Sequence, residues 1–210
     1  NCVVIQAALP LECEYLVGLL SDVQQETRGG WVFWRGEYQG MNLIVSKTRM
    51  GLSNAAAATA IAIERYQPRA IINQGTSGGH NPDLNVFDIV LGLETTNFGM
   101  VKTPFSERGA GSNSLHWHEA FDMLPDDESD PEPIRKRYYP ADAALLTAAR
   151  AVKQTYAQGQ VVEGVIGSAD CWNKELDSIA FLREMHGKDV EGMEAASVAQ
   201  IERKHGVPMM

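Results

Sequence analysis

The chain has 210 residues, of which 44% are hydrophobic and 21% charged, which is ordinary for a globular protein with one sizeable core. Its net charge of −9 argues against nucleic acid and anionic membranes as partners. No apolar run approaches the roughly 18 residues of a membrane-spanning helix. We therefore expect one domain over residues 1–210 in the cytoplasm. Export of a processed form stays open, because the chain begins at Asn1 without a methionine.

The first half of the chain alternates short apolar runs with helical repeats. Gln39 and Gly40 separate two extended runs, which is typical of a hairpin, and Pro68 follows an Ala-rich helical pattern. In chain order we expect a strand at 3–5, a helix over 9–20, strands at 31–38 and 41–46, a helix over 54–66 and a strand at 71–73.

The second half continues this alternation after a polar interruption. We expect a strand at 86–92, a segment without periodicity at 98–139, a helix over 141–156, a strand at 161–168 and helices over 179–185 and 195–205. Strands alternating with helices predict an α/β fold, a three-layer α/β/α sandwich with a central mixed β-sheet.

The polar segment 98–139 is long for a connection, so it is interpreted as an insertion or a lid. It contains the acidic run 126–128 and two histidines, His116 and His118. Since no third ligand stands at a recognisable spacing, we expect no metal site. Cys2, Cys13 and Cys171 have unrelated spacings and are expected to be core residues.

The strand at 71–73 ends in Gln74-Gly75-Thr76-Ser77-Gly78-Gly79. Glycines let a backbone approach a ligand closely, while hydroxyls and bared amides donate hydrogen bonds. Ligands of α/β proteins bind at the carboxyl ends of strands. This turn is therefore a candidate ligand site, with a tight turn that binds nothing as the alternative.

Other strand ends carry an aromatic ring, a sulfur and carboxylates, namely at Glu12, Met50, Gly51, Trp172, Asn173, Met193 and Glu194. A nucleoside fits this set. Trp172 can stack on a base, Glu194 can accept from both ribose hydroxyls, and a second carboxylate can activate water. For Glu12 the alternative is a solvated residue in the first turn of a helix.

Four motifs in order carry a resemblance that covers the chain except for 98–139: residues 7–12 (AALPLE), 75–79 (GTSGG), 165–170 (VIGSAD) and 192–195 (GMEA). In these the chain resembles the nucleoside phosphorylase/nucleosidase superfamily, most closely its 5'-methylthioadenosine/S-adenosylhomocysteine nucleosidases. The resemblance implies hydrolysis of the N-glycosidic bond of an adenine nucleoside, without cofactor or metal, by a homodimer.

The resemblance also implies roles for individual residues. Glu12 would deprotonate water, and Glu194 would hold the ribose hydroxyls and support positive charge on the sugar. The expected substrate contacts are Met193 on the ribose, Trp172 and Asn173 on the adenine, Thr76, Ser77 and Gly78 near the water and sugar, and Met50 beside the 5'-substituent. Asp170 is expected to be structural.

Departures from the family pattern leave alternatives open. Phosphorylases carry an arginine two residues before the glycine turn, where this chain has Asn73, and this favours water over phosphate. The family's acid is expected beyond Met210, so the domain is predicted to lack its C-terminal strand and helix. Gly192 replaces an acidic residue and Trp172 a phenylalanine. The alternatives are a purine nucleoside phosphorylase and a non-catalytic nucleoside-binding or storage protein on the same fold.

Overall fold

A computed structural model describes residues 2–120 and 138–210, so the acidic run 126–128 lies outside the described residues. The α-helices of the described ranges are α1 (Pro10–Leu19), α2 (Leu52–Tyr66), α3 (Ala143–Val152), α4 (Leu176–His186) and α5 (Ala195–His205). Two 3-10 turns, η1 (Ser114–His116) and η2 (Lys153–Thr155), accompany them. None of these helices combines the length and apolar character that crossing a membrane requires.

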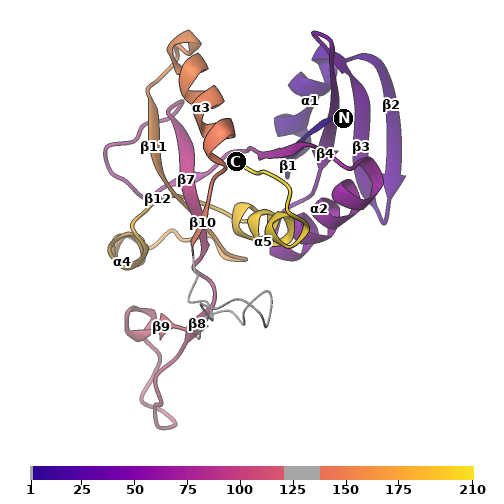
Figure 1. The fold of residues 1–210 in the computed structure, drawn as a ribbon. Helices are drawn as coiled ribbons and strands as arrows, with labels where there is room; N and C mark the ends of the chain where they lie inside the picture. Colours follow the sequence, from indigo (N-terminus) through magenta and orange to yellow (C-terminus); the bar gives the residue numbers. More distant parts are fainter. Residues whose placement is uncertain (1, 121–137) are drawn as a thin grey trace.

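The strands form two five-stranded mixed sheets and a small hairpin (Figure 1). The first sheet has the order β2 (Ser21–Arg28), β3 (Trp31–Tyr38), β4 (Met41–Lys47), β1 (Val3–Ala7) and β5 (Ala70–Asn73). The second has the order β10 (Tyr138–Pro140), β7 (Ile89–Asn97), β11 (Val161–Ser168), β12 (Lys188–Gly192) and β6 (Gly78–Gly79). The hairpin pairs β8 (Val101–Lys102) with β9 (His118–Glu119).

Residues 208–210 connect facing edges of the two large sheets. The Ile71 amide donates to the Pro208 carbonyl, and the Met210 amide donates back to Ile71, so the segment runs parallel to edge strand β5. The Met209 carbonyl also accepts from the Asp142 amide, just after edge strand β10. Figure 1 shows the C-terminus between the sheets accordingly.

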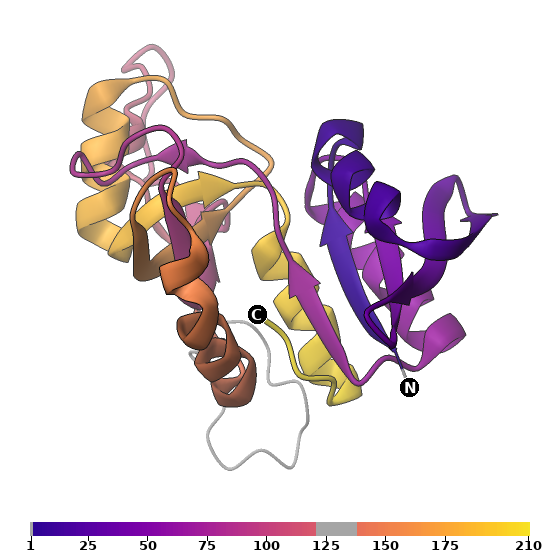
Figure 2. The same cartoon turned by 90° about the horizontal axis from the view of Figure 1, so that it is seen from above.

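Helices cover both faces of the first sheet, which gives the layered α/β architecture expected from the alternation of elements. Adjacent residues of β4 point to opposite faces: Ile44 packs into the cluster that contains Ala62 of α2 and Val198 of α5, whereas Val45 packs with Cys13 of α1. From above, α5 lies between the two sheets (Figure 2). The predicted α/β fold with mixed strands is confirmed.

One predicted strand and one predicted helix start at other residues, and one strand of the first sheet was not predicted. The strand expected at 86–92 is β7, which starts at Ile89, because Val86 and Phe87 are exposed in the preceding turn. The helix expected over 141–156 begins at Ala143, where the Asp142 carboxylate accepts from two backbone amides, and its last turn is 3-10. Strand β2 was not predicted, because its sequence is polar and almost wholly exposed.

The pKa of Glu202 on α5 provides a test of the packing between α5 and the start of α3. Burial, together with the nearby Asp142 carboxylate, raises this pKa to about 7. The folded protein therefore retains a proton that the unfolded chain loses near pH 4.5, so this group lowers stability as the pH rises towards 7. We expect Glu202→Gln to be more stable than the parent protein at pH 8, by on the order of 1–2 kcal/mol, but not at pH 4.

Urea unfolding at the two pH values measures this difference. Glu37→Gln is the control, because Glu37 is an exposed residue of β3. A gain from Glu202→Gln that is equal at both pH values would contradict the assignment.

Candidate active site

The Glu12 carboxylate is held at the end of β1 by four donors. Glu12 lies in the first turn of α1, where its Oε2 accepts from the Ala8 and Leu9 amides at 3.1 and 2.9 Å. Its Oε1 accepts from the amide and hydroxyl of Thr76 at 2.7 and 2.8 Å. A Cβ atom added to Gly75 would lie only 3.1 Å from this oxygen, so a glycine suits the close approach of the turn. The structure thus joins two predicted site residues, Glu12 and Thr76.

The Glu194 carboxylate joins the ends of β12 and β4. Its Oε1 accepts from the Gly51 amide at 3.1 Å and its Oε2 from the Met193 amide at 3.0 Å. Gly51 has φ of 101°, and a Cβ there would lie 2.9 Å from an Asp170 oxygen, so only glycine fits. Burial raises the pKa of Glu194 above its usual value, the two amides oppose that rise, and the charges of Glu12 and Asp170 add to it.

The other predicted residues lie around these carboxylates. The Ser77 hydroxyl is 3.8 Å from the Cβ position of Gly192, as is a Glu194 oxygen. The Trp172 ring lies 3.5 Å from the Cβ position of Gly78 and is half exposed. Met50 is 56% exposed beside Gly51. These residues come from five separate strand ends. Parallel pairing of β1 with β4 and β5, and of β11 with β12, brings the carboxyl ends of these strands to the same edge of each sheet.

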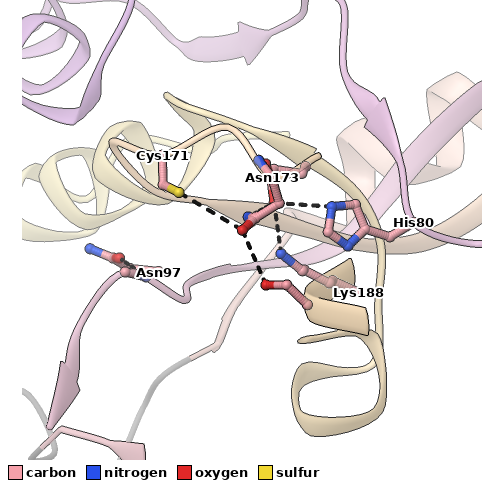
Figure 3. A network of polar contacts seen from close by, with 8 residues as sticks. His80, Asn97, Cys171, Asn173 and Lys188 are labelled. Atoms are coloured by element: carbon pink, nitrogen blue, oxygen red, sulfur yellow. Dashed lines mark hydrogen bonds and ion pairs between the residues drawn. The ribbon is translucent and has the colours of Figure 1, made fainter. Parts of the chain in front are cut away.

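Asn173 is held by a buried ionic cluster that the sequence analysis did not identify. Its backbone and side-chain amides donate to the two oxygens of Glu191 at 2.8 and 2.6 Å. Glu191 also contacts Lys188 Nζ and His80 Nε2, both at 3.0 Å. Glu191 and Lys188 are at most 1% exposed and His80 6%. Figure 3 shows His80, Lys188 and Asn173 converging from three segments of the chain.

The contacts in this cluster keep Glu191 ionised. Burial by itself would raise the pKa of Glu191, but hydrogen bonds from His80, Asn173 and Lys188 lower it to about 2. Burial lowers the pKa of Lys188, and the contact with Glu191 opposes that lowering. The Lys188 ammonium also lies 3.3 Å from the centroid of the Phe98 ring. The cluster thus holds the turn 168–173 in place through Asn173, which donates to a buried carboxylate whose charge is compensated by Lys188.

A β-bulge explains why the alternation of β12 did not reveal this cluster. Lys188 pairs with Val165 and Val190 with the next residue, Ile166, so Asp189 is the extra residue. In a regular strand residues three apart face opposite sides, and the bulge brings Lys188 and Glu191 to the same side. Three of the five residues of β12 are charged, so the sequence did not indicate which of these charges are buried.

Asp170 adds a further contact to the turn 168–173. The Asp170 carboxylate accepts from the Leu52 amide at 2.8 Å, which is a structural contact at the start of α2. Cys171 is exposed, so the expectation of a core position is wrong for this cysteine, whereas Cys2 and Cys13 are buried. The described residues contain no group of three histidine, cysteine or acidic side chains that could hold a metal.

Comparison with known proteins identifies the family. The family model described as "Phosphorylase superfamily" matches residues 3–210. The chain belongs to this superfamily. A 5'-methylthioadenosine/S-adenosylhomocysteine nucleosidase of Bacillus thuringiensis (strain Al Hakam) is 29% identical over 209 residues, which are 99% of this chain and 82% of that protein.

Solved structures of this superfamily share the fold. The nucleosidase of Neisseria meningitidis in complex with methylthio-immucillin-A has a TM-score of 0.80 at 24% identity, covering 99% of this chain and 82% of the other. A futalosine hydrolase mutant of Helicobacter pylori has a TM-score of 0.77 at 22% identity, covering 100% and 86%. At these identities the likeness establishes a nucleoside phosphorylase-like fold.

The buried cluster leads to a stability prediction. Glu191→Met leaves the Lys188 ammonium buried without its carboxylate, and we expect it to lower the free energy of unfolding by roughly 3–5 kcal/mol. The double variant Lys188→Met/Glu191→Met removes both charges and should recover a large part of that loss. Denaturant unfolding measures all three proteins.

The exposed pair Arg150 and Glu163 is the matched control, with a contact of 2.7 Å and side chains 45% and 32% exposed. Glu163→Gln should cost less than ~1 kcal/mol. A double variant no more stable than Glu191→Met would show that the two charges are not coupled.

Proposed function

We propose that this chain is a nucleosidase, which hydrolyses the N-glycosidic bond of an adenine nucleoside of the 5'-methylthioadenosine/S-adenosylhomocysteine class and releases adenine. The observation that carries the proposal is the convergence of two carboxylates, Glu12 and Glu194, beside the glycine turn and an exposed tryptophan. The name of the Bacillus relative, which matches 99% of the chain, supports the same substrate class.

In this proposal Glu12 is the general base. A carboxylate has about four acceptor sites, and three of the four donors to Glu12 are backbone amides that cannot turn away. The fourth is the Thr76 hydroxyl, which rotates freely about its C–O bond. An attacking water takes the place of this hydroxyl at Oε1 and hydrogen-bonds to Thr76 as well. Glu12 then accepts a proton from the water as the bond to the sugar forms.

Glu194 is the sugar-binding carboxylate. Each of its oxygens accepts one backbone amide, so each retains an acceptor site, which matches the two vicinal hydroxyls of a ribose. The sugar acquires positive charge in an oxocarbenium-like transition state. Because Glu194 is half-buried near two other acids, a developing cation nearby is stabilised more than it would be in water.

The remaining predicted residues take the contacts that their positions allow. Trp172 stacks on the base, and Gly78 lies close to that ring. Met193 packs on the ribose beside Glu194, and Ser77 faces the sugar. Met50, which is exposed beside Gly51, contacts the 5'-substituent.

Water is proposed as the nucleophile in place of phosphate. Asn73 is uncharged at the position where phosphorylases of the superfamily are expected to carry arginine. The departing adenine gains a proton as its bond to the sugar breaks. We further propose a cytoplasmic homodimer with a single domain over 1–210, in which the segment 98–139 is an insertion or lid.

The role of Glu12 as the general base is tested with the variant Glu12→Gln. We expect adenine release from methylthioadenosine by the full-length protein in phosphate-free buffer, and a loss of roughly 10²–10⁴-fold in kcat for Glu12→Gln. Glutamine retains the shape of the side chain but cannot take the proton. Glu14→Gln is the matched control, because Glu14 is exposed on the same helix.

Phosphate separates the alternatives in the same assay. Release that requires phosphate would make the protein a phosphorylase. If there is no release with or without phosphate, while methylthioadenosine still binds, the protein is a nucleoside-binding protein and the proposed hydrolysis is wrong.

A further inference from the structure

A cavity of about 470 Å³ lies beside the turn 168–173. Its volume is within the range of roughly 300–1,000 Å³ found for sites that enclose small organic ligands. The turn contributes Asp170, Cys171 and Asn173 to the wall. The apolar part of the wall comes from the segment after β7 and from α4: Phe98, Met100, Trp117, Phe181, Leu182 and Met185.

The orientation of the Asn173 amide is determined by its neighbour. An ionised carboxylate accepts hydrogen bonds but donates none, so the Asn173 Nδ2 must face Glu191, as it does at 2.6 Å. The backbone amide of Asn173 is occupied by the other Glu191 oxygen. Asn173 therefore turns its carbonyl Oδ1 away from Glu191, where this oxygen can accept a hydrogen bond, while the second Nδ2 hydrogen remains a donor.

The Asn173 Oδ1 is directed towards the cavity wall. Its neighbours there are the Ser178 hydroxyl at 3.4 Å and the Cys171 thiol at 3.8 Å, and both residues line the cavity (Figure 3). Both contacts are long for hydrogen bonds, so an amine N–H can replace them at small cost. The turn thus presents a hydrogen-bond acceptor at the mouth of an apolar space.

Hydrogen bonds at the start of α2 link the wall of the cavity to the proposed sugar-binding end of the site. Leu52 and Asp170 both line the cavity, and the Leu52 amide donates to Asp170. The preceding residue, Gly51, donates its amide to Glu194. A nucleoside whose ribose lies on Glu194 and whose ring lies on Trp172 would therefore direct the far edge of its base towards this cavity.

We propose that the site takes adenine nucleosides that carry an apolar substituent on the exocyclic amine. The single N–H of such an amine donates to Asn173 Oδ1, and the substituent fills the cavity. The cavity of about 470 Å³ is large enough for a substituent of several non-hydrogen atoms. This inference deepens the proposed function, because it rests on the same base-binding turn.

The test compares two free bases in equilibrium binding, which needs no turnover. Adenine and N6-benzyladenine are titrated into the full-length protein by calorimetry. We expect N6-benzyladenine to bind at least tenfold more tightly, because its phenyl ring leaves water for an apolar wall. Equal or weaker binding of N6-benzyladenine would overturn the proposal.

Variants locate the substituent. Met185→Trp fills the cavity from α4 and should abolish the preference for N6-benzyladenine. Cys171→Phe narrows it from an exposed position, where folding is not at risk, and should reduce the preference as well. Leu176→Trp is the matched control, because Leu176 is 79% exposed on the same helix and does not line the cavity. A preference that survives both Met185→Trp and Cys171→Phe would place the substituent elsewhere and overturn the proposal.

The two proposals fail in different ways. If methylthioadenosine is not hydrolysed but N6-benzyladenine still binds with the expected preference, the proposed function is wrong and the cavity proposal holds. If hydrolysis depends on Glu12 but the preference is missing, the cavity proposal alone is wrong.

Discussion

The proposed base side of this site depends on the contacts of the buried Glu191 carboxylate. This carboxylate collects donors from three separate segments: His80 after β6, Lys188 at the start of β12, and Asn173 after β11. Taking a carboxylate and an ammonium out of water costs several kcal/mol each, which is tolerable only when every partner is in place. The cluster therefore specifies one arrangement of these segments, and the orientation of the Asn173 amide follows from it.

The sugar side is built on a different principle. Glu12 and Glu194 are held chiefly by backbone amides, and each lies where a helix begins. Two glycines allow these amides to come close to the carboxylates. Gly75 does so because it lacks a Cβ atom, and Gly51 does so because it lacks a Cβ atom and has a positive φ. Backbone amides orient a carboxylate without neutralising it. Each Glu194 oxygen thus keeps an acceptor site for a ribose hydroxyl, and at Glu12 the attacking water of the proposed reaction replaces the Thr76 hydroxyl.

The parts of the molecule that could be predicted from sequence are those governed by local rules. Hydrophobic period and turn residues located most elements, and strand ends located Glu12, Thr76 and Glu194 near one another. Strand β2 lacks such a pattern, since its pairing with β3 rather than a buried face holds it in place. The Lys188 and Glu191 pair depends on a bulge that only pairing of β12 with β11 reveals.

The distribution of charge across the site accords with the proposed reaction. At the base end the negative charge of Glu191 is compensated by Lys188, so the pocket offers the base a neutral carbonyl. At the sugar end Glu12, Glu194 and Asp170 are close enough for their charges to raise the pKa of Glu194. The proposed reaction would relieve part of that repulsion, because positive charge forms on a sugar held near these acids. In the proposed reaction this placement of acids would favour an oxocarbenium-like state over a neutral nucleoside.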